Sequence, residues 1–338
     1  MVLNLLRSGF ETDICLEIPD KGVLEDEAAG YGCTIHHLTR RSVSMIKHHK
    51  ELCQIAKKYE IVHIHTQNSF LALIEVLVLR YAKVKKIIVH SHNTKDWRKT
   101  SILQSLCGPV LCKLSVPAAC SSEAGEWMFK TRNVHLLPLP VDTKRFSFDQ
   151  KKRDLERRRM HLHDIVLFHA GNFREAKNHK FLIDVMRLLN LESPGKYTLL
   201  LAGEGSLREE IMEYAKGLPV YFLGSINDMP EKMMAADIFL LPSLNEGLPT
   251  VVLEAQASGL PCYISDRITK EASIADLVKF LPLQEDIWVK EIERKVLSGA
   301  CQNERFAYGK IIEKTNSIEQ TKNAILGLYR EDASCRKI

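Results

Sequence analysis

The chain has 338 residues, of which 45% are apolar and 26% are charged, and its formal net charge is +5. A chain of this length and composition is expected to be a soluble globular protein with two domains, each able to bury its own core. The mild positive charge is too weak to indicate nucleic-acid binding, but it is compatible with anionic substrates or an anionic membrane surface.

The sequence gives no sign of export, membrane insertion or disulfide bonding. Nine cysteines form an odd number, and no two of them are spaced as Cys-x-x-Cys. This pattern is typical of a reduced cytoplasmic chain and argues against a disulfide framework or a zinc site. The most apolar helical run, Phe70–Leu79, is too short to cross a bilayer, and no signal-peptide pattern is visible. Four cysteines lie in apolar contexts that predict buried thiols: Cys107, Cys112, Cys120 and Cys262.

Short apolar runs alternate with longer helical patterns along the first half of the chain. This alternation predicts an α/β fold with a parallel sheet. The predicted strands are Ile61–His65, Lys86–His90, Val116–Cys120 and Val134–Pro138, and the predicted helices are Ser44–Lys58, Ser69–Tyr81 and one that Ser121 or Ser122 caps.

Residues 141–163 are charged and lack strand periodicity, which predicts a connection between domains. The basic run Lys151–Arg159 within it is interpreted as a solvated linker or helix face. A second α/β series follows, so the repeated layout predicts two Rossmann-like domains that face each other. Its predicted strands are Ile165–Ala170, Tyr197–Ala202, Val220–Leu223, Ile238–Leu241 and Pro261–Ser265, and its predicted helices are Asn178–Leu189, Ser206–Lys216 with a capping box at its start, Asp228–Ala236 and Pro249–Ser258.

The segment Glu246-Gly-Leu-Pro-Thr-Val-Val-Leu-Glu254 follows a predicted strand and is the most informative part of the sequence. Proline is favoured at the first helical position and glycine just past the last, so Pro249 and Gly259 predict the bounds of a helix. A helix N-terminus reached through a glycine attracts anions. An unpaired Glu254 among apolar residues would be costly, and a ribose diol would satisfy it. The segment therefore predicts a nucleotide-diphosphate site with an anion cradle at Gly247–Thr250; a surface helix with an exposed glutamate is the alternative.

A second candidate phosphate site follows the first strand of the second domain. Gly171 would let the backbone approach a diphosphate and Lys177 would supply a cation, although a plain strand-to-helix loop has the same pattern. The turns Ala202–Gly205 and Leu223–Asn227 are weak signals by themselves, because such turns are more often structural.

Histidines gather at two predicted strands of the first half. His63 and His65 alternate on one strand as a metal pair would, but the sequence shows no further ligand at a suitable spacing, so no metal site is predicted. His90 and His92 end the next strand, where a histidine is often only a hydrogen-bonded surface residue. Asp-x-Asp, P-loop, zincin and nucleophile-elbow motifs are absent from the sequence.

Taken together, these motifs resemble those of a known enzyme family. The Glu246–Glu254 segment resembles the Glu-x7-Glu signature of retaining GT-B glycosyltransferases, in particular glycosyltransferase family 4. The first-half segments His-Ile-His-Thr-x-Asn-Ser-Phe and Val-His-Ser-His-Asn-Thr resemble those of capsular and exopolysaccharide glycosyltransferases. The resemblance spans essentially the whole chain and is most specific over residues 165–275.

The resemblance implies roles for individual residues. Lys177 and the helix start would stabilise the leaving diphosphate, Glu254 would hold the ribose, and Glu246 would contact the transferred sugar. His92, with His90 as the second choice, would lie beside the reacting sugar at the acceptor face. The predicted catalytic residues are thus His92, Glu246 and Lys177. The predicted donor-binding residues are Gly171, Asn172, Arg174, Lys177, Gly203, Gly205, Ile226, Asn227, Glu246, Gly247, Leu248, Pro249, Thr250 and Glu254.

The fold that the resemblance implies is α/β of the GT-B type, with parallel sheets in two facing Rossmann-like domains and a C-terminal helix that crosses back to the first. The predicted bounds are 1–145 for an acceptor-side domain, 146–163 for a linker, 164–312 for a nucleotide-sugar donor domain, and 313–338 for the C-terminal helix and tail.

The leading hypothesis is the transfer of a sugar, with retention, from a nucleotide-sugar to a glycan or lipid-linked acceptor in cell-surface polysaccharide biosynthesis. The donor is expected to be a UDP-sugar. Because the sequence lacks Asp-x-Asp, no metal or other cofactor is expected. We expect a cytoplasmic enzyme with peripheral contact at the inner membrane surface and no nucleic-acid partner. An inactive nucleotide-sugar-binding protein and a GT-B nucleotide-sugar epimerase are the alternatives, which acceptor-dependent release of UDP would separate from a transferase.

The sequence departs from the family pattern in three places. Asn172 stands where the commoner pattern has arginine, and Arg174 is the candidate substitute. Leu139–Asp142 stands where Asn-Gly-Ile-Asp is usual. Met1–Arg7 resembles the middle of the family's first helix, so the usual first strand and its Gly-rich loop are expected to be missing from a truncated chain.

Overall fold

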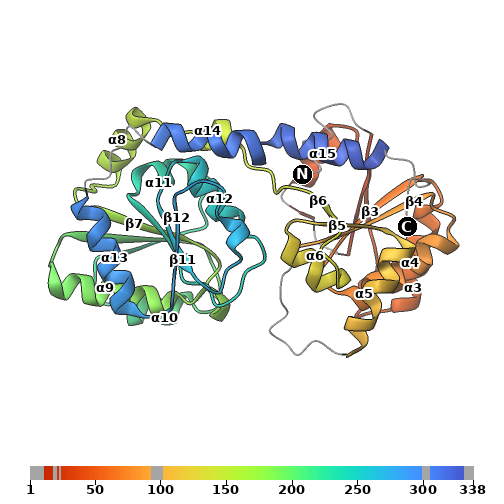
Figure 1. Ribbon diagram of the computed structural model, residues 1–338, viewed down its shortest axis with the longest axis horizontal. Coiled ribbons are helices and arrows are strands. Elements are labelled where there is room, and N and C mark those ends of the chain that lie inside the picture. The colour runs from red at the N-terminus through yellow and green to blue at the C-terminus, as the bar shows by residue number, and fades with distance from the viewer. Residues whose placement is uncertain (1–10, 18–20, 23, 93–101, 299–304, 331–338) are drawn as a thin grey trace. The chain divides into compact units, whose positions relative to one another are not determined.

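The computed structural model describes residues 11–17, 21–22, 24–92, 102–298 and 305–330. The chain forms two compact units, which Figure 1 shows. Unit 1 combines Met1–Pro140 with Ile318–Ile338, and unit 2 is Val141–Ser317. The predicted helix at Met1–Arg7 lies outside the described residues.

Unit 1 is an α/β unit whose paired strands are all parallel. Its main sheet has the order β3 (Ile61–Thr66), β4 (Lys86–Ser91), β5 (Val116–Ala119) and β6 (His135–Leu136). A two-stranded parallel sheet pairs β1 (Ile14–Leu16) with β2 (Ile35–His37). Its helices are α2 (Glu25–Gly30), α3 (Met45–Ala56), α4 (Ser69–Tyr81), α5 (Ile102–Leu114), α6 (Ser122–Phe129) and α15 (Ile318–Arg330).

Side-chain caps explain where several helices of unit 1 begin. Ser44, Asn68 and Ser121 precede α3, α4 and α6, and each side chain accepts a hydrogen bond from a backbone N–H in the first turn of its helix. Such a cap satisfies N–H groups that have no partner inside the helix. Of the two serines predicted to cap α6, the structure selects Ser121, whose Oγ accepts from the N–H of Ala124 at 3.0 Å.

The two faces of the unit 1 sheet are covered by different helices. One face packs against α4, α5 and α6 in a core that includes Val76, Leu79 and Phe129. On the other face, Ile325 and Leu328 of α15 pack against Ile88, Ala118 and Leu137 of the sheet and its edge. The last described helix of the chain therefore belongs to the core of unit 1, in agreement with the predicted return of a C-terminal helix to the first domain.

Unit 2 is built on a six-stranded parallel sheet with helices on both sides (Figure 1). Its strand order is β12 (Val278–Leu281), β11 (Cys262–Ser265), β10 (Ile238–Leu241), β7 (Ile165–Ala170), β8 (Tyr197–Ala202) and β9 (Val220–Gly224). Its helices are α7 (Thr143–Phe146), α8 (Gln150–Arg159), η1 (Glu175–Lys177), α9 (His179–Glu192), α10 (Arg208–Tyr214), α11 (Met229–Ala235), α12 (Thr250–Ala257), η2 (Lys270–Ala272), α13 (Glu285–Leu297) and α14 (Arg305–Asn316).

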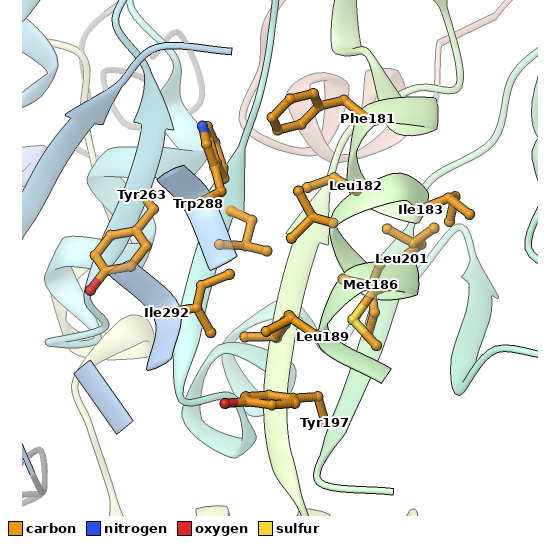
Figure 2. Packing of buried hydrophobic residues seen from close by; sticks show 14 of the residues in the cluster. Phe181, Leu182, Ile183, Met186, Leu189, Tyr197, Leu201, Tyr263, Trp288 and Ile292 are labelled. Atoms are coloured by element: carbon orange, nitrogen blue, oxygen red, sulfur yellow. The ribbon is translucent and has the colours of Figure 1, made fainter. Parts of the chain in front are cut away.

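One hydrophobic core of unit 2 lies between the sheet and helices α9 and α13. Trp288 of α13 is fully buried, and its ring meets the ring of Phe181 of α9 edge to face at 5.3 Å (Figure 2). The indole N–H donates to the carbonyl of Pro282 at 2.8 Å, so the buried polar atom is satisfied. Burial of large side chains of this kind contributes about 1.5–3 kcal/mol each and fixes both helices on this face.

Two features of unit 2 differ from the sequence predictions. The capping box predicted at Ser206 does not form: α10 starts at Arg208, and no side chain caps it. In this turn the N–H of Arg208 donates to the carbonyl of Gly205 at 3.2 Å, and the N–H of Leu207 donates to that of Phe173 in a neighbouring loop at 3.1 Å. In addition, β12 and α13 lie in a stretch for which the sequence pattern predicts no element.

The predicted linker 146–163 contains an ordered helix of unit 2. Asp149 caps α8, and one face of this charged helix is buried: Arg153 is 3% exposed. Its charged residues find partners across the unit. Arg157 contacts Asp237, while Glu156 contacts Lys232. A composition that indicates a solvated segment thus belongs to a packed helix, because each buried charge is paired.

Two buried arginines bind the carbonyl end of α11. Arg153 Nη1 donates to the carbonyls of residues 234, 235 and 236 at 2.8–2.9 Å, and its Nη2 contacts Asp237 at 2.6 Å. Arg305 donates to carbonyls of the same turn from the start of α14. The last carbonyls of a helix have no partner within it, so both guanidinium groups satisfy exposed acceptors and complement the helix dipole. None of the described helices is long and apolar enough to cross a membrane.

We predict that Arg153→Met destabilises the protein by about 1.5–3 kcal/mol, because it removes the buried guanidinium bonds to Asp237 and to the carbonyls of residues 234–236, which Arg157 and Arg305 satisfy only in part. The matched control is Arg158→Met on the exposed face of α8, which should change stability by less than about 0.5 kcal/mol. Urea unfolding, followed by circular dichroism, measures both. Equal stability of the two variants would contradict the role assigned to Arg153.

Candidate functional site

The candidate site lies at one edge of the unit 2 sheet. In the strand order β12–β11–β10–β7–β8–β9, the chain runs outward from β7 to β9 and then crosses to the other side of β7 to form β10. The loops after β7 and β10 therefore leave the sheet in opposite directions. Open α/β sheets bind ligands at such a switch point, outside the carboxyl ends of the strands. All predicted donor-binding residues lie in the loops after β7, β8, β9 and β10, in η1 or in α12.

The loops on the two sides of the switch point meet through an ion pair. Lys177, at the end of η1 after β7, contacts Glu246 in the loop after β10. Ser243 Oγ donates to the same carboxylate oxygen, Glu246 Oε1, at 2.7 Å. Both partners are largely buried, with side chains 22% and 15% exposed. The structure thus brings together two residues to which the family resemblance assigns separate roles, one toward the diphosphate and one toward the sugar.

Glu254 is a half-buried carboxyl group in α12, one turn after the helix start. Desolvation by burial raises its pKa to about 7, and the nearby charge of Arg145 opposes that rise. Pro249 is the N-cap residue and Thr250 the first helical residue, so the helix starts one residue later than predicted. The raised pKa indicates that the ionised form of Glu254 is poorly stabilised in the structure. This agrees with the expectation that the carboxylate needs a hydrogen-bond partner.

The glycines of the loop after β8 permit close contact with the loop after β7. The N–H of Gly171 donates to the carbonyl of Ala202 at 2.9 Å, and the N–H of Phe173 donates to that of Glu204 at 3.0 Å. Gly203 has φ +136°, and a Cβ at this position would lie 2.1 Å from the carbonyl oxygen of Gly171. The glycine pair, a weak signal in the sequence, is therefore required for the two loops to lie side by side.

Two buried histidines support the loop after β7, and sequence reasoning did not assign them a role. His169 Nδ1 donates to the carbonyl of Leu240 at 2.8 Å, which ties β7 to β10. His179 stacks on Phe173 with 4.0 Å between ring centroids. Burial lowers the pKa of His169 well below its usual value and that of His179 to about 4. Both imidazoles are therefore neutral near pH 7.

Other predicted residues lie in the same set of loops without converging on one point. Asn172 and Arg174 are exposed in the loop after β7, and Ile226 and Asn227 follow β9. Sequence reasoning missed Arg145 of α7, whose Nη2 donates to the carbonyl of Asn227 at 2.6 Å. It also influences the Glu254 carboxyl group, as described above. The sequence signal for Arg145 is limited to its position three residues after Asp142. Oδ1 of Asp142 caps the short helix α7 by accepting a hydrogen bond from the N–H of Arg145 at 3.0 Å.

His92 belongs to unit 1 and follows directly after β4. Its Nε2 is hydrogen bonded to Nδ1 of His65 at 2.8 Å, and burial lowers its pKa. The ring of His90, the second candidate at this strand end, lies 4.1 Å from that of His92 between centroids. The structure thus places both candidate histidines of this strand end, His92 and His90, within a group of histidines.

Comparisons with known proteins agree with this architecture. The family model described as "Glycosyl transferases group 1" matches residues 164–286. EpsF of Bacillus subtilis (strain 168), which is named as a glycosyltransferase, is 31% identical over 358 aligned residues that cover 97% of this chain and 92% of that protein. The UDP-Gal:alpha-D-GlcNAc-diphosphoundecaprenol alpha-1,3-galactosyltransferase of Escherichia coli is 27% identical over 253 residues, which cover 67% of this chain and 64% of that protein.

A solved structure extends the likeness to the whole fold. Anabaena Alr3699/HepE, solved in complex with UDP and glucose, matches with a TM-score of 0.78 at 14% identity, covering 97% of this chain and 94% of that one. The match confirms the predicted GT-B fold class of two α/β units with parallel sheets.

We predict that Gly203→Ala costs about 2–5 kcal/mol of folding stability, because the overlap of Cβ with the Gly171 carbonyl adds to the backbone strain. The control is Gly195→Ala, which also has a positive φ, +75°, but no atom within 4 Å of the added Cβ, and which should cost only about 1–2 kcal/mol. Thermal and urea unfolding compare the two. If both variants lose the same stability, the contact between the loops is not what requires Gly203.

Proposed function

This chain belongs to the group 1 family of glycosyltransferases, and we propose that it transfers a hexosyl group, with retention, from a UDP-sugar to a lipid-linked or glycan acceptor in cell-surface polysaccharide biosynthesis. We further assign it to glycosyltransferase family 4. The observation that carries the proposal is the meeting of Lys177 and Glu246 at the switch point of the unit 2 sheet, with Glu254 in the helix that follows.

Lys177 is the residue proposed to neutralise the leaving diphosphate. The neighbouring imidazoles of His169 and His179 are neutral, so Lys177 and the exposed Arg174 supply the positive charge at the loop after β7. A diphosphate that reaches the switch point would compete with Glu246 for this ammonium group. The N–H groups at the start of α12, next to Gly247 and Leu248, would add a second source of stabilisation. Groups positioned in advance for developing charge often give the largest single contribution to catalysis.

Glu246 is proposed to contact the transferred sugar once Lys177 engages the diphosphate. Its carboxylate remains oriented by Ser243 through the 2.7 Å hydrogen bond, so it stays directed into the site. Glu254 is proposed to accept hydrogen bonds from the ribose hydroxyls. Arg145, between Glu254 and the loop after β9, is a further candidate for donor contact. His92 is the proposed acceptor-side residue of unit 1.

Relatives support the choice of donor and acceptor class. The Escherichia coli relative is named for a UDP-galactose donor and a diphosphoundecaprenol-linked acceptor, and HepE was solved with UDP. We therefore propose a UDP-sugar donor, a cytoplasmic site of action, and peripheral contact with the inner membrane surface where lipid-linked acceptors would be met. The direct test is UDP release by the purified chain, with and without a diphosphoundecaprenol-linked sugar. UDP release that requires the acceptor and gives a product of unchanged anomeric configuration supports the proposal. UDP release that needs no acceptor and gives no glycosylated product contradicts it.

We predict that UDP affinity rises about tenfold between pH 6 and pH 8, because ribose hydroxyls donate to the ionised form of Glu254 and its pKa in the free protein is about 7. The sign follows from the raised pKa: below pH 7 the carboxyl group is mostly protonated, and binding must release a proton. Glu254→Ala should weaken UDP binding at least about tenfold at pH 8. Titration calorimetry at several pH values measures both effects.

The control for this prediction removes the titrating group but keeps an acceptor. The UDP affinity of Glu254→Gln should vary with pH only through the titration of UDP itself. The additional pH dependence of the wild type should be absent. Glu209→Gln, on the exposed surface of α10, should behave as the wild type does. An identical pH profile for wild type and Glu254→Gln would remove Glu254 from the nucleotide site.

We predict that transfer does not depend on Mg²⁺ or Mn²⁺, because Lys177 and the start of α12 can neutralise the diphosphate. Activity should persist in excess EDTA and should not rise on addition of either ion. Lys177→Met should lower kcat strongly, and added Mg²⁺ should not restore it. Complete loss in EDTA that Mn²⁺ or Mg²⁺ reverses would contradict this mechanism.

A further inference from the structure

Four histidines of unit 1 lie together on one face of the sheet. His65 of β3 is directly opposite His90 of β4 in the parallel register. His63 precedes His65 by two residues, and His92 follows His90 by two, so strand alternation directs all four side chains to the same face. This is the face that α15 covers, because Ile88, which packs against α15, has the same parity as His90. The sequence shows two His-x-His pairs, and the strand register makes them one cluster.

The rings of this cluster are in contact. Ring centroids of His63 and His65 are 4.5 Å apart, those of His65 and His90 are 5.2 Å apart, and those of His63 and His90 are 5.3 Å apart. Each of these three residues offers one ring nitrogen, and the three atoms lie within 4.8 Å of one another. Nitrogen ligands around a tetrahedral Zn²⁺ lie about 2.0–2.1 Å from the metal and therefore about 3.3–3.4 Å from one another, so binding would require the three rings to rotate toward a common point.

Several nitrogens of the cluster are buried without a hydrogen bond. His90 is 1% exposed, and neither of its ring nitrogens has a hydrogen-bond partner in the described parts of the chain. Nε2 of His63 is likewise buried and without a partner there. Leaving such a group unsatisfied costs about 1–3 kcal/mol each, and buried polar atoms in native proteins nearly always have partners. A ligand bound between these rings would remove that cost.

Nδ1 of His63 and Nδ1 of His65 each make a hydrogen bond that suits metal ligation by the other nitrogen of the ring. Nδ1 of His63 is hydrogen bonded to the hydroxyl of Tyr329 on α15 at 2.9 Å, and Nδ1 of His65 is hydrogen bonded to His92 at 2.8 Å. If each Nδ1 carries the proton, Nε2 of His63 and of His65 presents a lone pair. Metal-binding histidines are commonly oriented by such a bond on the other ring nitrogen.

We propose that His63, His65 and His90 bind one first-row transition-metal ion such as Zn²⁺, with His92 and Tyr329 orienting the ligands. An all-imidazole set favours Zn²⁺, Co²⁺, Ni²⁺ or Cu²⁺ over Mg²⁺ and Ca²⁺, which prefer oxygen ligands. Three protein ligands leave a fourth position open to water or another small ligand. The proposal concerns unit 1 alone and does not depend on the sugar transfer proposed for unit 2.

The test is metal binding by the purified full-length chain, stripped with a chelator and kept reduced with a phosphine. Titration with Co²⁺ should give visible absorption bands of a tetrahedral site with one ion per chain, and Zn²⁺ should displace it. The double variant His63→Ala/His90→Ala should lose this site. Tyr329→Phe, which keeps the ring but removes the bond to His63, should bind about 10–100-fold more weakly. Because this variant removes a single oxygen, it answers the question even if the double variant fails to fold.

The matched control is His135→Ala, a change of an exposed histidine of β6 in the same unit, which should bind the metal as the wild type does. A thiolate-to-cobalt charge-transfer band would assign the binding to cysteines and overturn the proposal. So would Co²⁺ affinity that is the same in the wild type and in folded His63→Ala/His90→Ala. EDTA could also abolish transfer by the wild type in such a way that only Zn²⁺ restores it. If Zn²⁺ then fails to restore transfer by Tyr329→Phe, the effect of EDTA is assigned to the histidine cluster and not to the donor diphosphate.

Discussion

The pairing of β7 with β10 is the constraint on which the candidate site of unit 2 depends. Asp237 precedes β10, and its N–H donates to the carbonyl of Val166 while its Oδ2 accepts from the N–H of Val166, both at 2.8 Å. Buried Arg153 holds the same carboxylate, so α8, β7 and β10 are fixed together. The strands β8 and β9 lie on one side of β7, and β10 and the strands after it lie on the other side. Lys177 in the loop after β7 and Glu246 in the loop after β10 therefore meet at one edge of the sheet.

Burial decides the charges that this edge presents. It keeps the imidazoles of His169 and His179 neutral, so the positive charge at the loop after β7 comes from Lys177 and Arg174. It also raises the pKa of Glu254 to about 7, which makes a polar partner for this carboxyl group favourable near neutral pH. The same physical effect thus prepares one part of the edge for an anion and another for hydroxyl groups. The proposed binding of a nucleotide diphosphate follows from that combination.

Parallel pairing has a comparable consequence in unit 1. Register places His65 opposite His90, and the two-residue repeat of a strand adds His63 and His92 to the same face. The proposed metal site and the candidate site of unit 2 therefore arise in the same way, from side chains near the carboxyl ends of adjacent parallel strands. They differ in chemistry, since one collects neutral nitrogen ligands and the other collects a lysine and two carboxyl groups.

The sequence by itself determined the alternation of strands and helices, the positions of β7, β8 and β10, and the loops that carry Lys177, Glu246 and Glu254. These depend on local periodicity and on proline and glycine signals, which act over a few residues. Only the tertiary structure decided that α8 is a packed helix of unit 2, that Ser206 caps no helix, and that Lys177 pairs with Glu246. It also decided that His90 joins His63 and His65. Each of these depends on strand order, register or burial between residues far apart in the chain, and a local sequence pattern does not encode which strands become neighbours.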